Sequence, residues 1–292
     1  LEEQRAAMVR RMTVLHGLDQ RQVTAIGAIF SRSKWIGQGN PDAVRHPMTR
    51  GECIERRKAA GVRDEKKPAC GAPFMVPIFD PETEREADAK VCIDRYEFPN
   101  MPCDYPMTWV RTREAQALCE VMGKRLCDAH EWDGACAGRL KAAHDEYAWL
   151  RPRRTMQGLH NLNRELRWAY GTTKDHGKCA TTSAKSPKCT SPSWRECGSN
   201  TFPSGSFPEC KSAFGVYDQH GNVAEHMWLP RVVEELSSKG GKGVPEMKGS
   251  WFIWSKHVAH IDDCRWRAPP WHENEGDNHY SYHLGFRCCK DL

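Results

Sequence analysis

Apolar residues at helical spacing open the chain and predict two short helices within residues 1–31. The positions that form these apolar faces are Met8, Met12, Leu15, Val23, Ile26 and Phe30. Asp19, followed by Gln22 three positions later, is typical of a capping box at the start of the second helix. Helices this short bury little surface by themselves, so we expect them to pack against the main body or a partner.

From about residue 72 the pattern changes to short segments with many turns and tryptophans. Two helices still stand out, one from Arg113 to Gly123 and one from Asp128 to about Ala137. Residues 172–208 are rich in Ser, Thr, Pro and Lys, and we expect a long loop held by crosslinks. We therefore divide the chain into a basic helical extension, residues 1–71, and a main domain, residues 72–292.

Composition limits the possible classes of protein. The chain has 292 residues, 39% of them hydrophobic, and a mean hydropathy of −0.72. It holds no run of about 18 apolar residues, so we expect no transmembrane segment. The first residue is Leu1, and removal of a leader before it stays open.

The 14 cysteines are even in number and scattered along the chain without paired CxxC motifs. This pattern favours disulfides over zinc sites. Cys53 and Cys70 bracket a charged stretch that a disulfide could anchor. We therefore expect a protein that is secreted, periplasmic or displayed on the cell surface.

The net charge of +5 is concentrated near the N-terminus, because residues 1–72 carry 14 Lys and Arg against 8 Asp and Glu. One interpretation is a solvated helical extension. The other is that the basic extension docks on a protein partner or an envelope assembly. No stacking aromatic residues alternate with these charges, so we do not expect nucleic acid as a partner.

Several ordered motifs carry a family resemblance, and they are Cys92–Glu97, Tyr105–Val110, Glu114–Cys119, Gly123–Leu126, His130–Trp132, Phe214–Asp218, Gly221–Trp228, Lys248–Trp251 and Leu284–Cys288. In this order the chain resembles the formylglycine-generating (sulfatase-modifying) enzymes from about residue 90 to 292. The resemblance implies an α+β, C-type-lectin-like fold with little regular secondary structure, here rich in disulfides and preceded by the helical extension.

The resemblance also implies two disulfides, Cys119–Cys288 and Cys136–Cys264. It further implies calcium bound by Asn222, the Val223 carbonyl and Glu225, since calcium prefers carboxylate, amide and backbone oxygens. The alternative is that Asn222 stabilises a turn with positive φ. A second calcium set is matched more loosely, by Asn161, Leu162 and Asp175.

The family's usual chemistry uses two cysteine thiolates that bind Cu(I), in the loop that follows Ser250. The matching residues 252–263 contain no cysteine, and the next one, Cys264, is assigned to a disulfide. Ser250 cannot replace two thiolates. We therefore do not expect formylglycine synthesis by the usual mechanism.

Another chemistry could use the same region. His257 and His260, with Asp263 or its neighbour Asp262, offer imidazole and carboxylate ligands for iron or copper. A loop of solvated histidines is the alternative. We expect a pocket lined by His226, Ser250, Trp254, Trp271 and His272, with Trp251 in the core and with Trp254 and Trp271 exposed.

The sequence thus favours a calcium-stabilised, non-catalytic binding or structural component of a cell-envelope or extracellular assembly. The alternative is a metal-dependent oxidoreductase that uses its histidine-rich loop in place of the family's cysteines.

Overall fold

The structure is a computed structural model that describes residues 1–146, 153–230, 244–268 and 279–292. The α-helices are α1 Glu2–His16, α2 Gln20–Arg32, α3 Arg50–Ala59, α4 Thr112–Val121, α5 Ala129–Ala137, α6 Ala143–Glu146 and α7 Arg153–Asn163. The strands are β1 Met75–Ile78, β2 Val91–Asp94, β3 Arg125–Leu126, β4 Ala224–Leu229, β5 Val244–Lys248, β6 Leu284–Phe286 and β7 Cys288–Asp291. Short 3₁₀ turns lie at Pro68–Cys70, Glu86–Asp88 and His176–Lys178.

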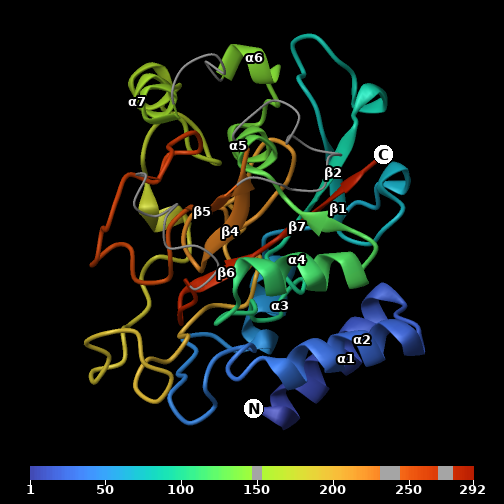
Figure 1. The fold of residues 1–292 in the computed structure, drawn as a ribbon, viewed down its shortest axis with the longest axis vertical. Helices are drawn as coiled ribbons and strands as arrows, with labels where there is room; N and C mark the ends of the chain where they lie inside the picture. Colours follow the sequence, from blue (N-terminus) through green and yellow to red (C-terminus); the bar gives the residue numbers. More distant parts are fainter. Residues whose placement is uncertain (147–152, 231–243, 269–278) are drawn as a thin grey trace.

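The N-terminal helices pack on the main body, beneath α4 in the view of Figure 1. One hydrophobic cluster contains Met8 and Ile26 from these helices together with Leu118 of α4 and Phe286 of β6. The predicted capping box of Asp19 and Gln22 is confirmed at the start of α2. Residues 1–32 therefore contribute directly to the core around α4.

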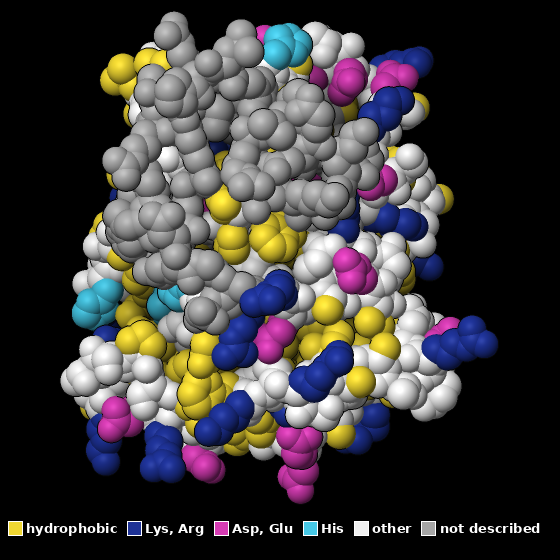
Figure 2. Space-filling model, viewed as in Figure 1, with side chains coloured by type: hydrophobic (Ala, Val, Ile, Leu, Met, Phe, Trp, Pro, Cys, Tyr) yellow, Lys and Arg dark blue, Asp and Glu magenta, His cyan; other side chains and the backbone are white. Residues whose placement is uncertain are grey.

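Part of the positive charge of the extension is neutralised inside the chain. Arg11 and Arg50 both pair with the buried carboxylate of Asp104, and Arg57 pairs with Asp64. Lys and Arg side chains also lie across the lower half of the face in Figure 2, with hydrophobic surface between them. Other cations of the extension, among them Arg10, Arg21 and Arg32, are exposed.

The two helices that the sequence predicts in the main domain lie close to their predicted places, whereas α6 and α7 were not predicted. The first runs over Thr112–Val121, and the second over Ala129–Ala137 with Asp128 as its N-cap. Asp128 and Glu131 complete a capping box, and Glu131 also pairs with Arg125. Every residue of the second helix is buried, so it forms the centre of the domain.

Two small sheets make up the β structure. The first has the antiparallel order β1-β2-β7-β3, and the second has the order β5-β4-β6, in which β4 and β6 run parallel. The C-terminal segment links the sheets because β6 belongs to one and β7 to the other (Figure 1). Long loops connect these short strands, as the predicted mixed fold with little regular structure requires.

All 14 cysteines lie in described segments and form seven disulfides. The two implied by the resemblance, Cys119–Cys288 and Cys136–Cys264, are present. Cys53 and Cys70 bond to separate partners, Cys103 and Cys92, so two disulfides anchor the charged stretch between them. Cys179–Cys210 and Cys189–Cys197 hold the loop of residues 172–208.

Disulfides in this number indicate a chain that folds in an oxidising compartment, outside the cytoplasm. Within the described segments, no helix has the length and apolar character needed to cross a bilayer.

Candidate functional site

The buried guanidinium of Arg287 holds the start of β4 in place. Arg287 donates to both oxygens of Glu225, with distances of 2.6 and 2.5 Å, and to the carbonyl oxygen of Tyr217. The indole of Trp132 donates to the same carboxylate at 2.9 Å. Because Arg287 and Glu225 are each 1% exposed, this pair locks the start of β4 to α5 and the C-terminal segment.

The turn before β4 is held by Glu97. Asn222 has a positive φ of 57°, donates to Glu97 through its amide at 2.7 Å, and accepts from the backbone N–H of Phe202 at 2.8 Å. The N–H of Val223 donates to the other oxygen of Glu97 at 3.0 Å. Asn222 therefore stabilises a left-handed turn, which is the alternative role that its position predicts.

These contacts bear on the calcium expectation. The amide oxygen of Asn222 accepts from Phe202, its backbone oxygen accepts from Phe252, and the carboxylate of Glu225 is shared by Arg287 and Trp132. A calcium ion needs several of these oxygens at once. In this arrangement the donor set does not fit the ion unless Glu225 turns away from Arg287, so calcium at this turn stays a prediction.

The three residues of the second calcium set each make other contacts. The side-chain amide of Asn161 donates to the carbonyl of Arg267 and accepts from the N–H of the same residue. The Leu162 side chain is 79% exposed, and Asp175 caps the turn at His176–Lys178. Each residue has a local structural role here, and calcium at this position also stays a prediction.

Aromatic rings and histidines from distant segments form one cluster around β4 and the loop that follows Ser250. We name this the aromatic–histidine cluster, and its members are Trp109, His226, Trp251, Trp254, His260, His279, Tyr282 and His283. The Trp251 and Trp254 rings meet edge to face at 4.6 Å between centroids. His283 lies 4.8 Å from Trp251, which places the C-terminal segment over the loop.

Three histidines of this cluster, His226, His260 and His283, favour the neutral form. Burial, followed by the influence of neighbouring His279, lowers the pKa of His226 and of His283 to about 3. Burial also lowers the pKa of His260, whose ring stacks on Trp266 at 4.5 Å. At neutral pH these imidazoles are uncharged, which leaves one ring nitrogen of each with a lone pair.

Several nitrogens of the cluster have no hydrogen-bond partner among the described residues, and they are Nε1 of Trp109, Trp251 and Trp254 and Nε2 of His226 and His260. An unpartnered buried polar group costs about 1–3 kcal/mol of folding free energy. Such groups are uncommon in a core that has only a packing role. Their concentration here distinguishes this region from the purely apolar clusters of the fold.

The histidine-rich loop does not assemble the predicted transition-metal set. His257 is exposed, His260 packs among tryptophans, and the Asp263 carboxylate is held by Arg164 at 2.7 Å. In the described segments, three or more ligand atoms come within 4.8 Å of one another only where a disulfide takes part, namely in Cys136, His220 and Cys264 and in Cys127, Glu131 and Cys289.

The other predicted pocket residues divide into three cases. His226 joins the cluster, whereas the hydroxyl of Ser250 accepts from the Gly221 N–H and so has a structural contact. Trp254 has no exposed surface, so the prediction that it is exposed is wrong, because the loop folds its ring against Trp251 and His260. Trp271 and His272 lie outside the described residues.

Three further aromatic residues, which sequence reasoning missed, cover the outer side of Trp109. We name Trp35, Trp194 and Tyr280 the outer aromatic strip; all three are half-buried. The Trp35 and Trp194 rings are parallel to within 9°, with centroids 6.3 Å apart. The sequence did hold a signal for Trp35 and Trp194, because each lies next to a cation, in Lys34-Trp35 and Trp194-Arg195.

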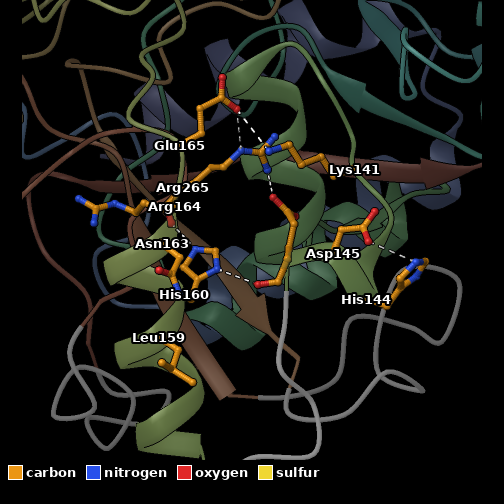
Figure 3. A pocket seen from close by; sticks show the side chains of 10 residues that line it. Lys141, His144, Asp145, Leu159, His160, Asn163, Arg164, Glu165 and Arg265 are labelled. Carbon is orange, nitrogen blue, oxygen red and sulfur yellow. Dashed lines mark hydrogen bonds and ion pairs between the residues drawn. The ribbon is translucent and has the colours of Figure 1, made fainter.

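A separate polar hollow of about 290 Å³ lies between α6 and α7 (Figure 3). Its side chains mainly satisfy one another, since Glu146 pairs with Arg265 and with His130, and His160 bonds to the backbone oxygens of Glu146 and Arg265. This network attaches the two helices to the C-terminal loop and leaves the aromatic–histidine cluster as the stronger candidate site.

Comparison with known protein families agrees with this architecture. The family described as "Sulfatase-modifying factor enzyme 1-like domain" matches residues 55–292. The chain belongs to this sulfatase-modifying-factor family. The family match starts at residue 55, within α3, so it includes part of the extension as well as the main domain. No curated protein sequence matches the chain.

Three solved structures that are similar to this chain share little sequence identity with it. PvdO from Pseudomonas aeruginosa shares 16% identity with a TM-score of 0.38, over 75% of this chain and 91% of that chain. CarF shares 14% identity with a TM-score of 0.40, over 75% and 98% of the two chains. The Major Tropism Determinant P3c variant shares 12% identity with a TM-score of 0.34, over 75% and 53%.

Proposed function

We propose that this chain is a non-catalytic binding component of an extracellular or cell-envelope assembly, built on the sulfatase-modifying-factor fold. The observation that supports this most directly is the state of its cysteines. Every thiol is used in a disulfide, including Cys264, the first cysteine after the loop that carries the family's copper ligands. Without a thiolate pair the chain lacks the soft ligands that hold and activate Cu(I).

The remaining features suit binding better than catalysis by thiols. The loop after Ser250 is filled by Phe252 and Trp254, both fully buried. The half-buried outer aromatic strip and the exposed cations of the extension provide two surfaces of distinct chemistry. Display outside the cytoplasm, whether secreted, periplasmic or on the cell surface, follows from the oxidised cysteines as part of the same proposal.

The experiment is a combined copper-binding and conversion assay. Purified protein is mixed with Cu(I), and with oxygen and a cysteine-containing sulfatase peptide, and the peptide mass is followed. We expect no conversion to the aldehyde. The variant Cys136→Ala frees the Cys264 thiol and serves as a positive control for Cu(I) binding by one sulfur. Conversion by the unmodified protein would overturn the proposal.

Calcium at the turn of Asn222, Val223 and Glu225 is a structural part of this proposal, and its binding requires that Glu225 turn away from Arg287. Its test is the melting temperature in calcium chloride against a chelator, for the wild-type chain and for Glu225→Gln. A calcium-dependent rise that the variant loses would support the ion. An unchanged wild-type melting temperature would mean that calcium does not bind at this turn and that Arg287 alone neutralises the charge of Glu225.

A second candidate is a changed form of the oxidoreductase alternative, in which His226 and His260 of the cluster hold iron or copper in place of the predicted His257, His260 and Asp263. His226 bonds to the backbone of Val110, and His260 bonds through Nδ1 to the carbonyl of Ile261. Nε2 of each has no partner within the described part of the chain. Ligating histidines are often fixed in this way through their other nitrogen. Retained iron or copper after dialysis, lost in His226→Ala but kept in His257→Ala, would favour this candidate.

A further inference from the structure

The outer aromatic strip borders a surface hollow of about 580 Å³ that none of the predicted sites includes. The residues that line it are Lys34, Trp35, Pro192, Ser193, Trp194 and Arg195. The lining combines two indole rings with two cations and contains no carboxylate. Concave sites that combine aromatic walls with a few charged groups are typical of small-ligand and chain-binding sites.

Both indoles are held in place before any ligand arrives. Trp35 precedes Gly37, which exchanges two backbone hydrogen bonds with Thr108, at 3.2 and 2.7 Å. Trp194 lies inside the short loop closed by Cys189–Cys197, and its carbonyl accepts from the side chain of Asn40 at 2.9 Å. A preorganised aromatic surface binds with a smaller loss of conformational entropy than a mobile one.

The ring beneath the strip supports both outer indoles. Trp109 is 2% exposed and meets Trp35 and Trp194 edge to face, with 5.8 and 5.5 Å between ring centroids. Its indole N–H is buried and has no partner among the described residues. The strip thus offers flat apolar faces that rest on a buried ring.

The charges around the strip are positive. Lys34 lies 5.2 Å above the Trp35 ring, and Arg111 lies 4.0 Å above the Tyr280 ring. Arg111 has a carboxylate partner in Glu114. Among the described residues neither Lys34 nor Arg195 forms an ion pair, so both cations are open to an anionic ligand. The exposed Glu196 is the nearest acidic residue in sequence.

We propose that the outer aromatic strip binds an acidic polysaccharide. Its sugar rings pack their C–H faces on Trp35 and Trp194, and its carboxylate or sulfate groups meet Lys34 and Arg195. This inference rests on the proposed binding function and names the class of its ligand. Single-stranded nucleic acid would also suit rings and cations. We favour the polysaccharide because the seven disulfides indicate an extracytoplasmic protein.

The test is isothermal titration of the intact protein with galacturonic acid hexamers and with chondroitin sulfate hexamers. A neutral maltohexaose and a six-nucleotide DNA serve as comparison ligands. We expect binding of an acidic hexamer that weakens as sodium chloride rises from 50 to 300 mM. Trp194→Ala should weaken it by about tenfold or more, as removal of a stacking ring does.

Matched variants separate this role from a structural one. Phe214→Ala removes a half-buried ring at a distance from the strip, and Lys188→Gln removes an exposed cation of the same loop that does not line the hollow. Both should bind like the wild type, whereas Arg195→Gln should bind more weakly. Melting curves show that each variant is folded, and Trp194→Phe replaces Trp194→Ala if the latter unfolds.

Absence of binding by both acidic hexamers would overturn the inference. So would equal binding of the neutral hexamer, tighter binding of DNA, or an affinity that Trp194 variants leave unchanged. The result of the copper and conversion assay does not depend on any of these outcomes. The inference about the ligand can therefore be wrong while the proposed non-catalytic role is right.

Discussion

The C-terminal cysteines form two parallel crosslinks whose stabilities should depend on each other. Cys288 and Cys289 are adjacent, and they bond to Cys119 and Cys127, which are eight residues apart. Taken alone, Cys119–Cys288 spans 169 positions, for which chain entropy gives about 5 kcal/mol. With Cys127–Cys289 intact it closes a ring of only about 10 residues, worth about 3 kcal/mol.

Removal of either crosslink should therefore cost about 3 kcal/mol of unfolding free energy. Removal of both should cost more than the two separate losses together. Once one crosslink is gone, the remaining one closes a larger ring that runs through Cys136–Cys264. Opening that ring costs about 4 kcal/mol of unfolding free energy. The variants are Cys119→Ala with Cys288→Ala, Cys127→Ala with Cys289→Ala, and all four together.

Urea unfolding, followed by tryptophan fluorescence under non-reducing conditions, measures the three losses. Each of the four cysteines is at most 1% exposed, so the missing sulfur atoms leave comparable cavities in each variant. A loss of about 5 kcal/mol or more for each pair, strictly additive in the fourfold variant, would refute the reasoning that the crosslinks act in parallel.

Three further predictions concern buried and exposed charges. Glu225→Ala leaves the Arg287 guanidinium buried without its counter-charge, and urea unfolding should show a loss of about 3–5 kcal/mol; a loss below 1 kcal/mol would contradict this. Burial raises the pKa of Asp218 to about 7, so the native state keeps a proton that the unfolded chain releases. Wild-type stability should therefore fall between about pH 4 and 7, and Asp218→Asn should flatten this slope in thermal melts, whereas an unchanged slope would count against it. His257→Ala changes an exposed side chain and should alter stability by no more than about 0.5 kcal/mol in the same urea assay.

Local signals predicted the helices well because their causes lie within a few residues. The Asp19 and Asp128 caps each meet a partner three positions later, and both helices begin where these pairs indicate. The Arg50–Ala59 helix escaped notice although Thr49 and Glu52 form the same kind of capping box. Its sequence is strongly charged, and the few residues that it buries, including Cys53 and Arg57, do not form an apolar stripe.

The site was harder to predict because its parts come from distant segments. Nothing near Glu225 in sequence indicates that Arg287 will occupy its carboxylate, 62 positions away. Trp254 was predicted to be exposed, yet the rings of Trp251 and His260 pack against it and it is fully buried. Trp35 and Trp194 come from distant segments, one beside the Gly37 pairing with Thr108 and the other inside the Cys189–Cys197 loop.

Non-reducing peptide mapping with thiol alkylation tests the central claim most directly, because that claim concerns the state of the cysteines. We expect the seven crosslinked peptide pairs of the structure, including Cys136–Cys264, and no alkylated cysteine. Two alkylated cysteines, one of them Cys264, in protein that also retains copper would contradict the account and restore a thiolate-based activity.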